Sequence, residues 1–468
     1  MAVIQGASPE APSADKIVTE GAYYIMDRCA SHDDVFPNVL EAFFAGIAEL
    51  EGQEAEAAVR RDGLAQMHKH FPVEKVLLLQ DHVRLALRED LYHWSYRVGH
   101  EDLKLDDPFY VDHLIVIRIH YPHLVARKAK TAIEPKPALA DTLDHARSAL
   151  SDPRIVANQI SRAIRRPRAK AAFEPAEFHN NLAIPAWAHS AHIDTWYGHS
   201  FDGINLWWSI DGVNIDNTVI LYPDMIGRPV KYEPEYMYRA PGEPISEPNQ
   251  VALEAGQLLL FNPEMLHSTQ VNVSDETRVA LTTRINPGRP KFSDKAPFNF
   301  EHWHTSPNLA KKKFAALKVF PAAKNQGVSS FKPRPKFEQT DTHKLTLDTA
   351  LQAETLTQVC ASNELPEGTK LAVNFPNAKL IFWRDGDGGI KAYSRLCPHV
   401  GVDLVDGFHD GDKLHCPGHG LSFDWQTGAS QCESMKLKAY IAVEEDGQIL
   451  VRKADSKATE ETLEHSAT

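Results

Sequence analysis

Two short loops near the C-terminus constrain the fold of this 468-residue chain more than any other feature. The first loop holds Cys397 and His399, and the second, after a gap of sixteen residues, holds Cys416 and His419. Each loop supplies one thiolate and one imidazole, so the cysteines can hold one iron and the histidines the other iron of a [2Fe–2S] cluster. A structural zinc site is the competing interpretation, but zinc sites usually combine Cys-x-x-Cys with a separate histidine pair. The pattern predicts a binuclear iron–sulfur site.

A second metal pattern lies in the middle of the chain. His192 and Asp194 are two residues apart, so on a β-strand both side chains would leave the same face. His267 follows a strand-like run at 257–261 and could supply a third ligand. Two imidazoles and one carboxylate form the facial triad of non-haem Fe(II) oxygenases, which leaves coordination positions open. The nearby His189 and His199 are expected to be hydrogen-bonding neighbours of the ligands.

Arginines follow this pattern on one predicted strand. Arg278 lies eleven residues after His267, and Arg284 falls on the same strand face as Arg278. A dicarboxylate such as 2-oxoglutarate needs a planar cation for its distal carboxylate, and arginine offers a bidentate fork. Either arginine could be this anchor, and the spare one could bind an acidic group of a substrate. An ion pair at the rim of a barrel is the structural alternative for both.

The length of the chain and the changes in composition along it predict several domains. A chain of this length is too long for one ordinary core. The Ala/Ser/Pro-rich start is expected to be disordered, and the basic, proline-containing stretch after the barrel is expected to be an extended linker. The predicted parts are a disordered start at 1–15, an oxygenase domain at 16–320 with a helical scaffold at 16–105 and a barrel at 106–300, a linker at 321–356, an iron–sulfur domain at 357–453 and a flexible tail at 454–468.

Strand-like runs separated by turn signals fill the barrel region. Residues 110–121 alternate, with Ile115, Ile117 and Ile119 on an apolar face and Arg118 and His120 on a partly polar face that would look toward a site. Short strands at this spacing predict a double-sheet barrel of the jelly-roll or cupin kind. The fold class is thus a helical region with a double-stranded β-helix, plus an all-β C-terminal domain. The other runs are 187–196, 204–210, 219–222, 251–261 and 278–285.

Residues 187–290 resemble the 2-oxoglutarate/Fe(II) oxygenase superfamily, in particular its phytanoyl-CoA dioxygenase-like branch. The resemblance rests on the His-Ile-Asp motif, the stretches at 205–211 and 220–223, and the later His267 and Arg278. It implies a double-stranded β-helix, with His192, Asp194 and His267 as iron ligands and Arg278 as the 2-oxoglutarate anchor. Members of this family convert 2-oxoglutarate into succinate and CO₂ while they oxidise a second substrate.

The region at 357–453 resembles the Rieske domain, whose two-loop signature matches CPHVG and CPGHG. Respiratory-chain members tie these loops with a disulfide, but this chain has Val402 and Gly418 at the matching places. Those members also place Ser and Tyr hydroxyls against the cluster, where this chain has Leu421 and Phe423. Fewer donors to the sulfurs lower the reduction potential, so we expect a value near about −150 mV, at the low end of the Rieske range.

Composition excludes several classes of function. A formal net charge of −13 argues against a nucleic-acid binder, because phosphate backbones recruit basic surfaces.

The sequence shows no apolar run near the ~20 residues that span a bilayer, and no secretory signal. Three cysteines fall outside the cluster pattern, which favours reduced thiols and a cytoplasmic location. A basic stretch at 162–170 could cover an anionic substrate, although a solvated helix face is the preferred interpretation.

Together the two patterns predict an oxidoreductase that hydroxylates or otherwise oxidises a small molecule with Fe(II), O₂ and 2-oxoglutarate. The attached cluster would supply or restore electrons to the mononuclear iron, with an external reductant or reductase as partner. Two alternatives stay open at this point. One is a Rieske-driven oxygenase that takes NAD(P)H electrons without 2-oxoglutarate, although the sequence lacks the Asp/Glu-x-x-His-x₄-His run of such enzymes. The other is a non-enzymatic redox sensor or electron carrier. Whether the chain forms oligomers is also left open.

Overall fold

The computed structural model describes residues 11–126, 188–234, 237–294 and 300–454. The chain divides into two compact units, and the division does not follow chain order, because two short stretches from the barrel region of the sequence cluster with the C-terminal part. Unit 1 comprises Met1–Gly227, Pro234–Tyr238 and Asn249–Pro333, and unit 2 comprises Arg228–Glu233, Arg239–Pro248 and Arg334–Thr468. The basic stretch at 162–170 lies outside the described residues.

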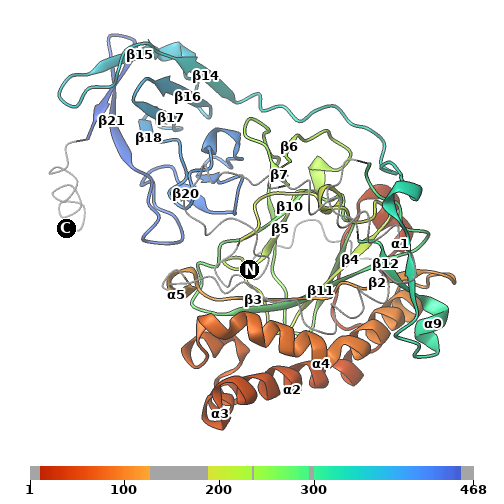
Figure 1. Cartoon of the computed structure of the whole chain (residues 1–468). Coiled ribbons are helices and arrows are strands. Elements are labelled where there is room, and N and C mark those ends of the chain that lie inside the picture. The colour runs from red at the N-terminus through yellow and green to blue at the C-terminus, as the bar shows by residue number, and fades with distance from the viewer. Residues whose placement is uncertain (1–10, 127–187, 235–236, 295–299, 455–468) are drawn as a thin grey trace, which may run out of the picture. The chain divides into compact units, whose positions relative to one another are not determined.

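Two long helices form the helical layer of unit 1, α2 at His32–Glu51 and α4 at Val76–Arg97. The apolar residues of α2 that recur every four positions are fully buried, as the spacing predicts. The helices approach closely at Gly46, where an added Cβ would lie 2.6 Å from Leu79 Cδ1. Figure 1 shows α4 lying along one face of the strands β3 and β11, with α2 beneath it.

The remaining helical segments are short. Helix α1 begins at Ala14, so the last two residues of the stretch expected to be disordered are helical, while residues 1–10 lie outside the described part. No helix in the described ranges has both the length and the apolar character of a membrane-crossing segment. The short segments of unit 1 are α1 Ala14–Glu20, α3 Gln53–Asp62, η1 Leu64–Lys69, η2 Val73–Lys75, η3 Val98–Asp102, α5 His123–Ala126, α8 Asp194–Tyr197, η5 Pro223–Met225, α9 Ser306–Ala310 and η6 Ala322–Lys324.

The larger sheet of unit 1 has the order β1-β9-β4-β11-β2-β12-β13, and β3 also pairs with β11. The predicted strand over 110–121 is interrupted after Asp112, whose Oδ1 accepts a hydrogen bond from the backbone N–H of Leu114. The strands are β1 Tyr24–Met26, β2 Tyr110–Asp112, β3 Val116–His120, β4 Ile204–Ser209, β9 Leu258–Phe261, β11 Arg278–Asn286, β12 His302–Thr305 and β13 Leu317–Val319.

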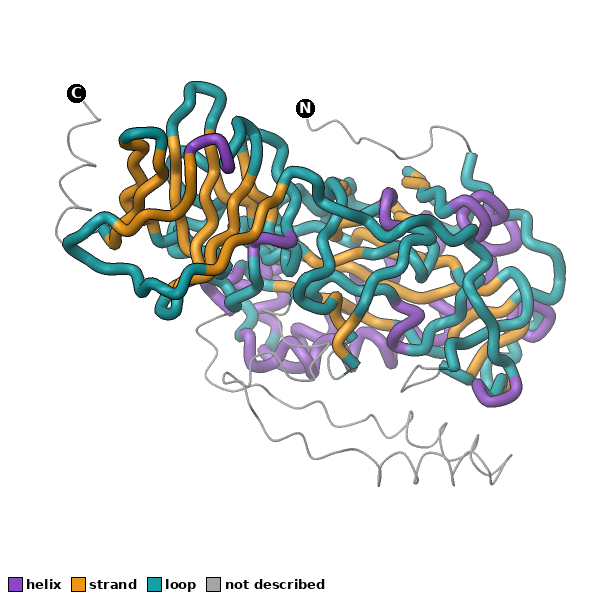
Figure 2. The backbone as a smooth tube through the Cα atoms, turned by 90° about the horizontal axis from the view of Figure 1, so that it is seen from above, coloured by secondary structure: helices purple, strands orange, loops and turns teal. Residues whose placement is uncertain are grey.

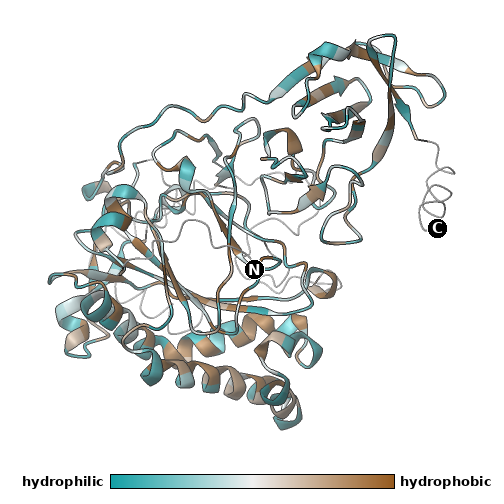
Figure 3. Cartoon of the chain, turned by 180° about the vertical axis from the view of Figure 1, so that it is seen from behind, coloured by the Kyte–Doolittle hydropathy of each residue, from teal (hydrophilic) through white to brown (hydrophobic). Residues whose placement is uncertain are grey.

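Alternation along β11 gives this sheet two different faces. Val279, Leu281 and Ile285 pack into the hydrophobic core shared with α2 and α4, where Trp208 also stacks on Trp94 with ring centroids 4.6 Å apart. Figure 3 shows hydrophobic residues running through these helices and strands. The alternate residues of β11, which include both candidate arginines, Arg278 and Arg284, therefore point to the opposite face.

A smaller sheet, in the order β10-β5-β8, contributes to a second apolar cluster. Its strands are β5 Val219–Leu221, β8 Asn249–Val251 and β10 His267–Thr269. Val219, Leu221 and Val251 share this cluster with Trp207 and Phe261 of the larger sheet. The run at 251–261 forms parts of two strands, because the chain turns at Gly256, whose φ of +86° favours glycine.

Unit 2 is built almost entirely from strands and loops (Figure 2). Its main sheet has the order β14-β16-β17-β18-β21-β22-β15, and β14 lies within the stretch that the sequence predicted as a linker. The elements of this sheet and its neighbours are β14 Thr342–Thr346, β15 Thr357–Ala361, η7 Ser362–Glu364, β16 Lys370–Phe375, β17 Ala378–Arg384, β18 Ile390–Ser394, η8 Leu404–Asp406, β19 Lys413–His415, β20 Ser422–Asp424, β21 Ala439–Glu445 and β22 Gln448–Lys453. Earlier in the chain, β6 Tyr232–Glu233 pairs with β7 Tyr238–Arg239, and Tyr238 of β7 is assigned to unit 1.

Asp406 ties the stretch at 239–248 to the rest of unit 2. Its Oδ2 accepts a hydrogen bond from the backbone N–H of Gly242 at 2.7 Å and lies 3.4 Å from Arg239 Nη1. Its backbone oxygen accepts from the N–H of Ile245 at 3.1 Å. Arg239 and Asp406 are both buried, so this contact joins charges that water does not screen.

Replacing Asp406 by alanine should destabilise unit 2 by about 3–5 kcal/mol, because it leaves Arg239 buried without its carboxylate. The free energy of unfolding can be measured in urea while the visible circular dichroism of the cluster is followed. Asp387→Ala is the matched control, since Asp387 is exposed and should change stability by no more than about 0.5 kcal/mol. A loss below about 1 kcal/mol for Asp406→Ala would contradict the role given to this pair.

Candidate metal centres

An antiparallel backbone bridge brings His192 and His267 together. The backbone N–H of each residue donates to the carbonyl oxygen of the other, at 2.9 and 3.0 Å, and the two ring centroids lie 4.2 Å apart. Nδ1 of His192 lies 2.7 Å from the backbone oxygen of Ser190, and Nδ1 of His267 lies 2.8 Å from that of Met265. A carbonyl can only accept, so each Nδ1 carries the proton and each Nε2 keeps a lone pair for a metal.

Asp194 completes the set, although not from a strand as predicted. The chain leaves the bridge directly after His192, and Asp194 is the first residue of α8. Its Oδ1 nevertheless lies 3.6 Å from His192 Nε2 and 3.8 Å from His267 Nε2. Among the described residues, this is the one place where ligand atoms of three His, Cys, Asp or Glu residues all lie within 4.8 Å of one another.

The protonation states of these three residues suit a divalent cation. Burial lowers the pKa of His192 to about 3 and also lowers the pKa of His267, so both imidazoles are neutral at neutral pH. Burial alone would raise the pKa of Asp194, but Arg284 and the neighbouring histidines hold it well below its usual value. Two neutral imidazoles and one carboxylate are the donor set that non-haem Fe(II) takes.

Arg284 is the ion-pair partner of Asp194, the carboxylate of the candidate metal site. Its Nη2 lies 2.8 Å from Oδ2 of Asp194, and Asn205 Nδ2 donates to the same oxygen at 2.9 Å. Both contacts hold Oδ2 and leave Oδ1 toward the two histidines. Sequence reasoning missed Asn205, although its place on a strand before an apolar run puts it on the same face as Trp207.

Arg278 has a different environment. Its Nη1 donates to the backbone oxygens of Asn217 and Thr218 at 2.8 and 3.2 Å, while its Nε is buried without a partner among the described residues. Burial lowers the pKa of Arg278 to about 9, so this cation is only weakly compensated. Of the two candidate arginines, Arg278 is therefore the one whose guanidinium is not already used by a carboxylate.

One cavity joins the three candidate ligands and both arginines. Trp207 forms part of its wall, while Trp208 lies in the core, because neighbouring residues of a strand point to opposite faces. His189 also lines the cavity, with its ring 5.3 Å from that of His192, and His199 Nδ1 lies 3.8 Å from Asp112 Oδ2. The full lining is Arg118, His189, His192, Asp194, Asn205, Trp207, Val219, Phe261, His267, Thr269, Arg278, Thr282 and Arg284.

In unit 2, two loops present the four residues of the C-terminal pattern. Cys397 and His399 follow β18, and Cys416 and His419 follow β19. A hydrogen bond joins the two thiols, and it lowers the pKa of Cys416. The two imidazole rings lie 4.9 Å apart at an angle of 84°. The loops thus bring the thiols together on one side and the imidazoles together on another, which is the pairing that a [2Fe–2S] cluster with Cys₂ and His₂ ligands requires.

Backbone donors also surround the thiols. The N–H groups of His399 and Val400 point to Cys397, and those of Gly418 and His419 point to Cys416. Donors to a ligating sulfur favour the reduced cluster. Leu421 and Phe423, which replace hydroxyl donors of the respiratory type, are both fully buried.

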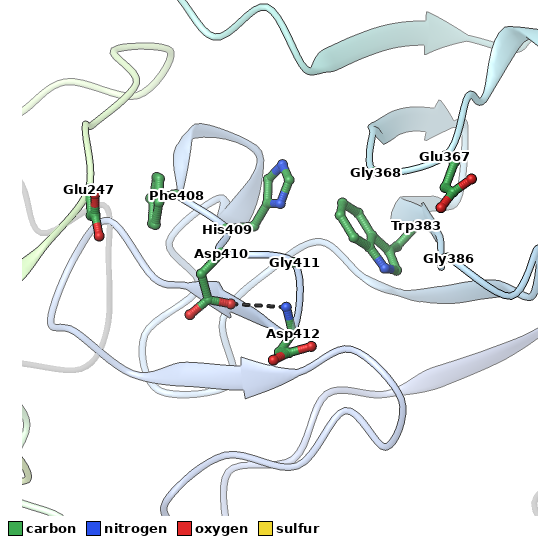
Figure 4. A pocket seen from close by; sticks show the side chains of 10 residues that line it. All are labelled: Glu247, Glu367, Gly368, Trp383, Gly386, Phe408, His409, Asp410, Gly411 and Asp412. Carbon is green, nitrogen blue, oxygen red and sulfur yellow. Dashed lines mark hydrogen bonds between the residues drawn. The ribbon is translucent and has the colours of Figure 1, made fainter. Parts of the chain in front are cut away.

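A larger hollow of about 660 Å³ lies elsewhere in unit 2 (Figure 4). Trp383, Phe408 and His409 line it together with acidic residues, and the backbone N–H of Asp412 donates to Asp410. None of the four cluster residues lines this hollow. Its size therefore does not mark it as the place of the iron chemistry.

Comparison with protein families supports both centres. Residues 120–280 match the model of the phytanoyl-CoA dioxygenase (PhyH) family, and residues 355–441 match that of the Rieske [2Fe-2S] domain. The naphthalene 1,2-dioxygenase system ferredoxin component of Pseudomonas aeruginosa is 31% identical over 90 residues, which are 19% of this chain and 86% of that protein.

Other relatives also match over part of the chain. The oxygenase component of 3-ketosteroid-9-alpha-monooxygenase from Rhodococcus rhodochrous is 30% identical over 101 residues, 19% of this chain and 25% of that protein. The oxidoreductase NdmD of Pseudomonas putida is matched over 12% of its length. The solved ferredoxin of carbazole 1,9a-dioxygenase from Nocardioides aromaticivorans IC177 is 30% identical, covers 22% of this chain and 100% of its own, and has a TM-score of 0.20.

Replacing Arg284 by glutamine should lower the affinity for a divalent metal by about 10–100-fold, because Asp194 loses the cation that orients it. Mn(II) binding to the metal-free protein, followed by electron paramagnetic resonance, measures this effect. Arg289→Gln is the control, since Arg289 donates to Asn325 and does not line the cavity. Equal affinities of the two variants would exclude a positioning role for Arg284.

Replacing Phe423 by tyrosine should raise the reduction potential of the cluster, because it restores a hydroxyl donor of the respiratory type. Reduction potentials of Rieske centres span about −150 to +300 mV, and the variant should move up within this range. A redox titration followed by electron paramagnetic resonance gives the potential. Phe408→Tyr adds the same hydroxyl at the hollow and should leave the potential unchanged. A potential that does not move in Phe423→Tyr would show that this side chain does not face the cluster.

Proposed function

We propose that this chain, which belongs to the Rieske [2Fe-2S] family through residues 355–441 and carries a phytanoyl-CoA dioxygenase domain at 120–280, is a non-haem iron oxygenase. It would oxidise a small molecule with O₂ and 2-oxoglutarate. The observation that carries this proposal is the convergence, on one cavity, of two neutral imidazoles, one carboxylate and an arginine that pairs with no carboxylate of the described residues. The larger and smaller sheets of unit 1 would be the two halves of a double-stranded β-helix.

The residues of the chain have separate roles in this scheme. His192, Asp194 and His267 would hold Fe(II), which together with 2-oxoglutarate supplies the oxidising chemistry. Arg278 would bind the distal carboxylate of 2-oxoglutarate through the side of its guanidinium that the backbone carbonyls leave unused. Trp207 and Phe261 give the cavity an apolar wall, which excludes water from the reacting groups.

The Rieske domain needs its own explanation, because 2-oxoglutarate already supplies two electrons in each completed cycle. We infer that this domain would supply the one electron that restores Fe(II) at His192, Asp194 and His267 after a turnover in which the substrate is not oxidised. The matching relatives include a component of a dioxygenase system that is named a ferredoxin. An external reductase would accordingly deliver electrons to the cluster.

A second candidate is a Rieske-driven oxygenase that uses no 2-oxoglutarate. It is favoured by the similarity of the Rieske region to an oxygenase component, which is one part of the 3-ketosteroid-9-alpha-monooxygenase of Rhodococcus rhodochrous. Against it stands Arg278, which has no evident role without an anionic co-substrate.

Succinate release from 2-oxoglutarate distinguishes the two candidates. The iron-loaded protein should release succinate slowly even without a second substrate, and His267→Ala should abolish this activity because it removes one of three metal ligands. Cys416→Ser should keep the initial rate of succinate release. When a reductase and NADH replace ascorbate as the reductant, however, this variant should stop releasing succinate earlier than wild type. Succinate release that is absent from the wild type would refute the first candidate, and oxidation of a substrate without 2-oxoglutarate would establish the second.

A further inference from the structure

Arg118 is a third arginine at the cavity, and neither proposed centre uses it. It lies in the middle of β3, opposite Ala280 of β11, so both side chains leave the same face of the larger sheet. Arg278 is opposite His120, the next residue of β3 on that face. The methyl group of Ala280 is small and leaves room for the Arg118 guanidinium within the cavity.

Arg118 lies close to the metal-ligating residues but forms no ion pair with them. It is half-buried, it interacts electrostatically with Arg284, Asp194 and Tyr197, and its partial desolvation lowers its pKa to about 10. Both oxygens of Asp194 are already engaged, Oδ2 by Arg284 and Asn205 and Oδ1 toward the histidines. Among the described residues, no carboxylate lies within ion-pair distance of Arg118.

The charges that line the cavity do not balance. Among the described residues that line it, three arginines stand against one carboxylate, that of Asp194. The next acidic group, Asp112, has its pKa raised by burial to about 7, so it adds less than a full negative charge. A cation that is held out of water costs free energy unless an anion pairs with it. A divalent metal at the site would increase the excess of positive charge further.

Arg118 and Arg278 are far enough apart to bind separate groups. They are diagonal neighbours across the β3–β11 pair, where residues lie roughly 7–8 Å apart and their Cβ atoms somewhat less. Arg278 would serve the distal carboxylate of 2-oxoglutarate, as proposed above. Arg118 lies nearer the metal-ligating end, since Arg284 and Asp194 are among its neighbours.

We propose that Arg118 is the anchor for an acidic group of the substrate, so that the cavity takes a small organic acid with a carboxylate beside 2-oxoglutarate. This assignment rests on the proposed function for the role of the second ligand, but the anion site itself depends only on the residues of the cavity. A guanidinium fork binds a carboxylate through two parallel hydrogen bonds. An uncharged amide of the same shape as the carboxylate could not form this charged pair.

The test compares carboxylates with their amides on the full chain loaded with Mn(II). Calorimetry gives the dissociation constants of benzoate, benzamide, acetate and acetamide, each with and without saturating 2-oxoglutarate. Wild type should prefer each acid over its amide by about tenfold or more, and Arg118→Gln should abolish this preference, since hydrogen bonds to charged groups have this strength. Arg289→Gln, outside the cavity, should retain the preference.

The same titrations separate this site from the co-substrate site. Arg118→Gln should change the affinity for 2-oxoglutarate by less than about threefold, whereas Arg278→Gln should lower it by about tenfold or more and keep the preference for acids. If Arg118→Gln fails to fold, as judged by circular dichroism, Arg118→Lys carries the test, because it keeps the charge but loses the fork and should weaken the preference.

Several results would overturn the inference. Equal binding of acid and amide by wild type would do so, as would binding of inorganic phosphate but not of either acid. A loss of 2-oxoglutarate affinity in Arg118→Gln as large as that in Arg278→Gln would make Arg118 a co-substrate anchor instead. If wild type does not bind 2-oxoglutarate but shows a preference for acids that Arg118→Gln abolishes, the anion site stands and the proposed function falls.

Discussion

The site in unit 1 depends on two backbone hydrogen bonds between residues that are 75 positions apart. The N–H and carbonyl groups of His192 and His267 bond each other, and this single bridge fixes both imidazoles on one side of the cavity. Each ring is further oriented by a carbonyl two residues before it. Because the backbone fixes both rings, the ring nitrogens that could bind a metal already lie close together. Binding a metal there would therefore cost little conformational entropy of the side chains.

The two arginines of β11 have different electrostatic partners. A buried carboxylate needs a cation, and Arg284 of β11 meets that need for Asp194. Arg278, six residues earlier on the same face, is turned toward backbone carbonyls, which compensate its charge only in part. One strand thus provides a cation that orients the carboxylate of the candidate metal site, and a second cation that pairs with no carboxylate among the described residues. The same face of one sheet would then serve both the proposed metal and its proposed co-substrate.

The sequence predicted the ligand residues and most strands because these follow from short-range patterns. It put Arg118 on the polar face of its strand, and Arg118 lines the cavity. It could not choose between Arg278 and Arg284, since the choice depends on which one Asp194 reaches after the chain turns into α8. The role of Asn205 was missed for the same reason, because a long-range contact leaves no local periodicity.

Unit 2 includes segments that the order of the sequence motifs does not predict. The sequence reads as two domains in series, yet the stretch at 239–248 clusters with the Rieske residues and buries Arg239 against Asp406. β14, from the predicted linker, adds a parallel strand beside β16. A Rieske domain cut out at its family boundaries of 355–441 would lose both, and would leave Asp406 without its partners. The cluster-bearing unit of this chain is therefore built from more than its motif-bearing segment, and its folding is coupled to residues encoded within the oxygenase region.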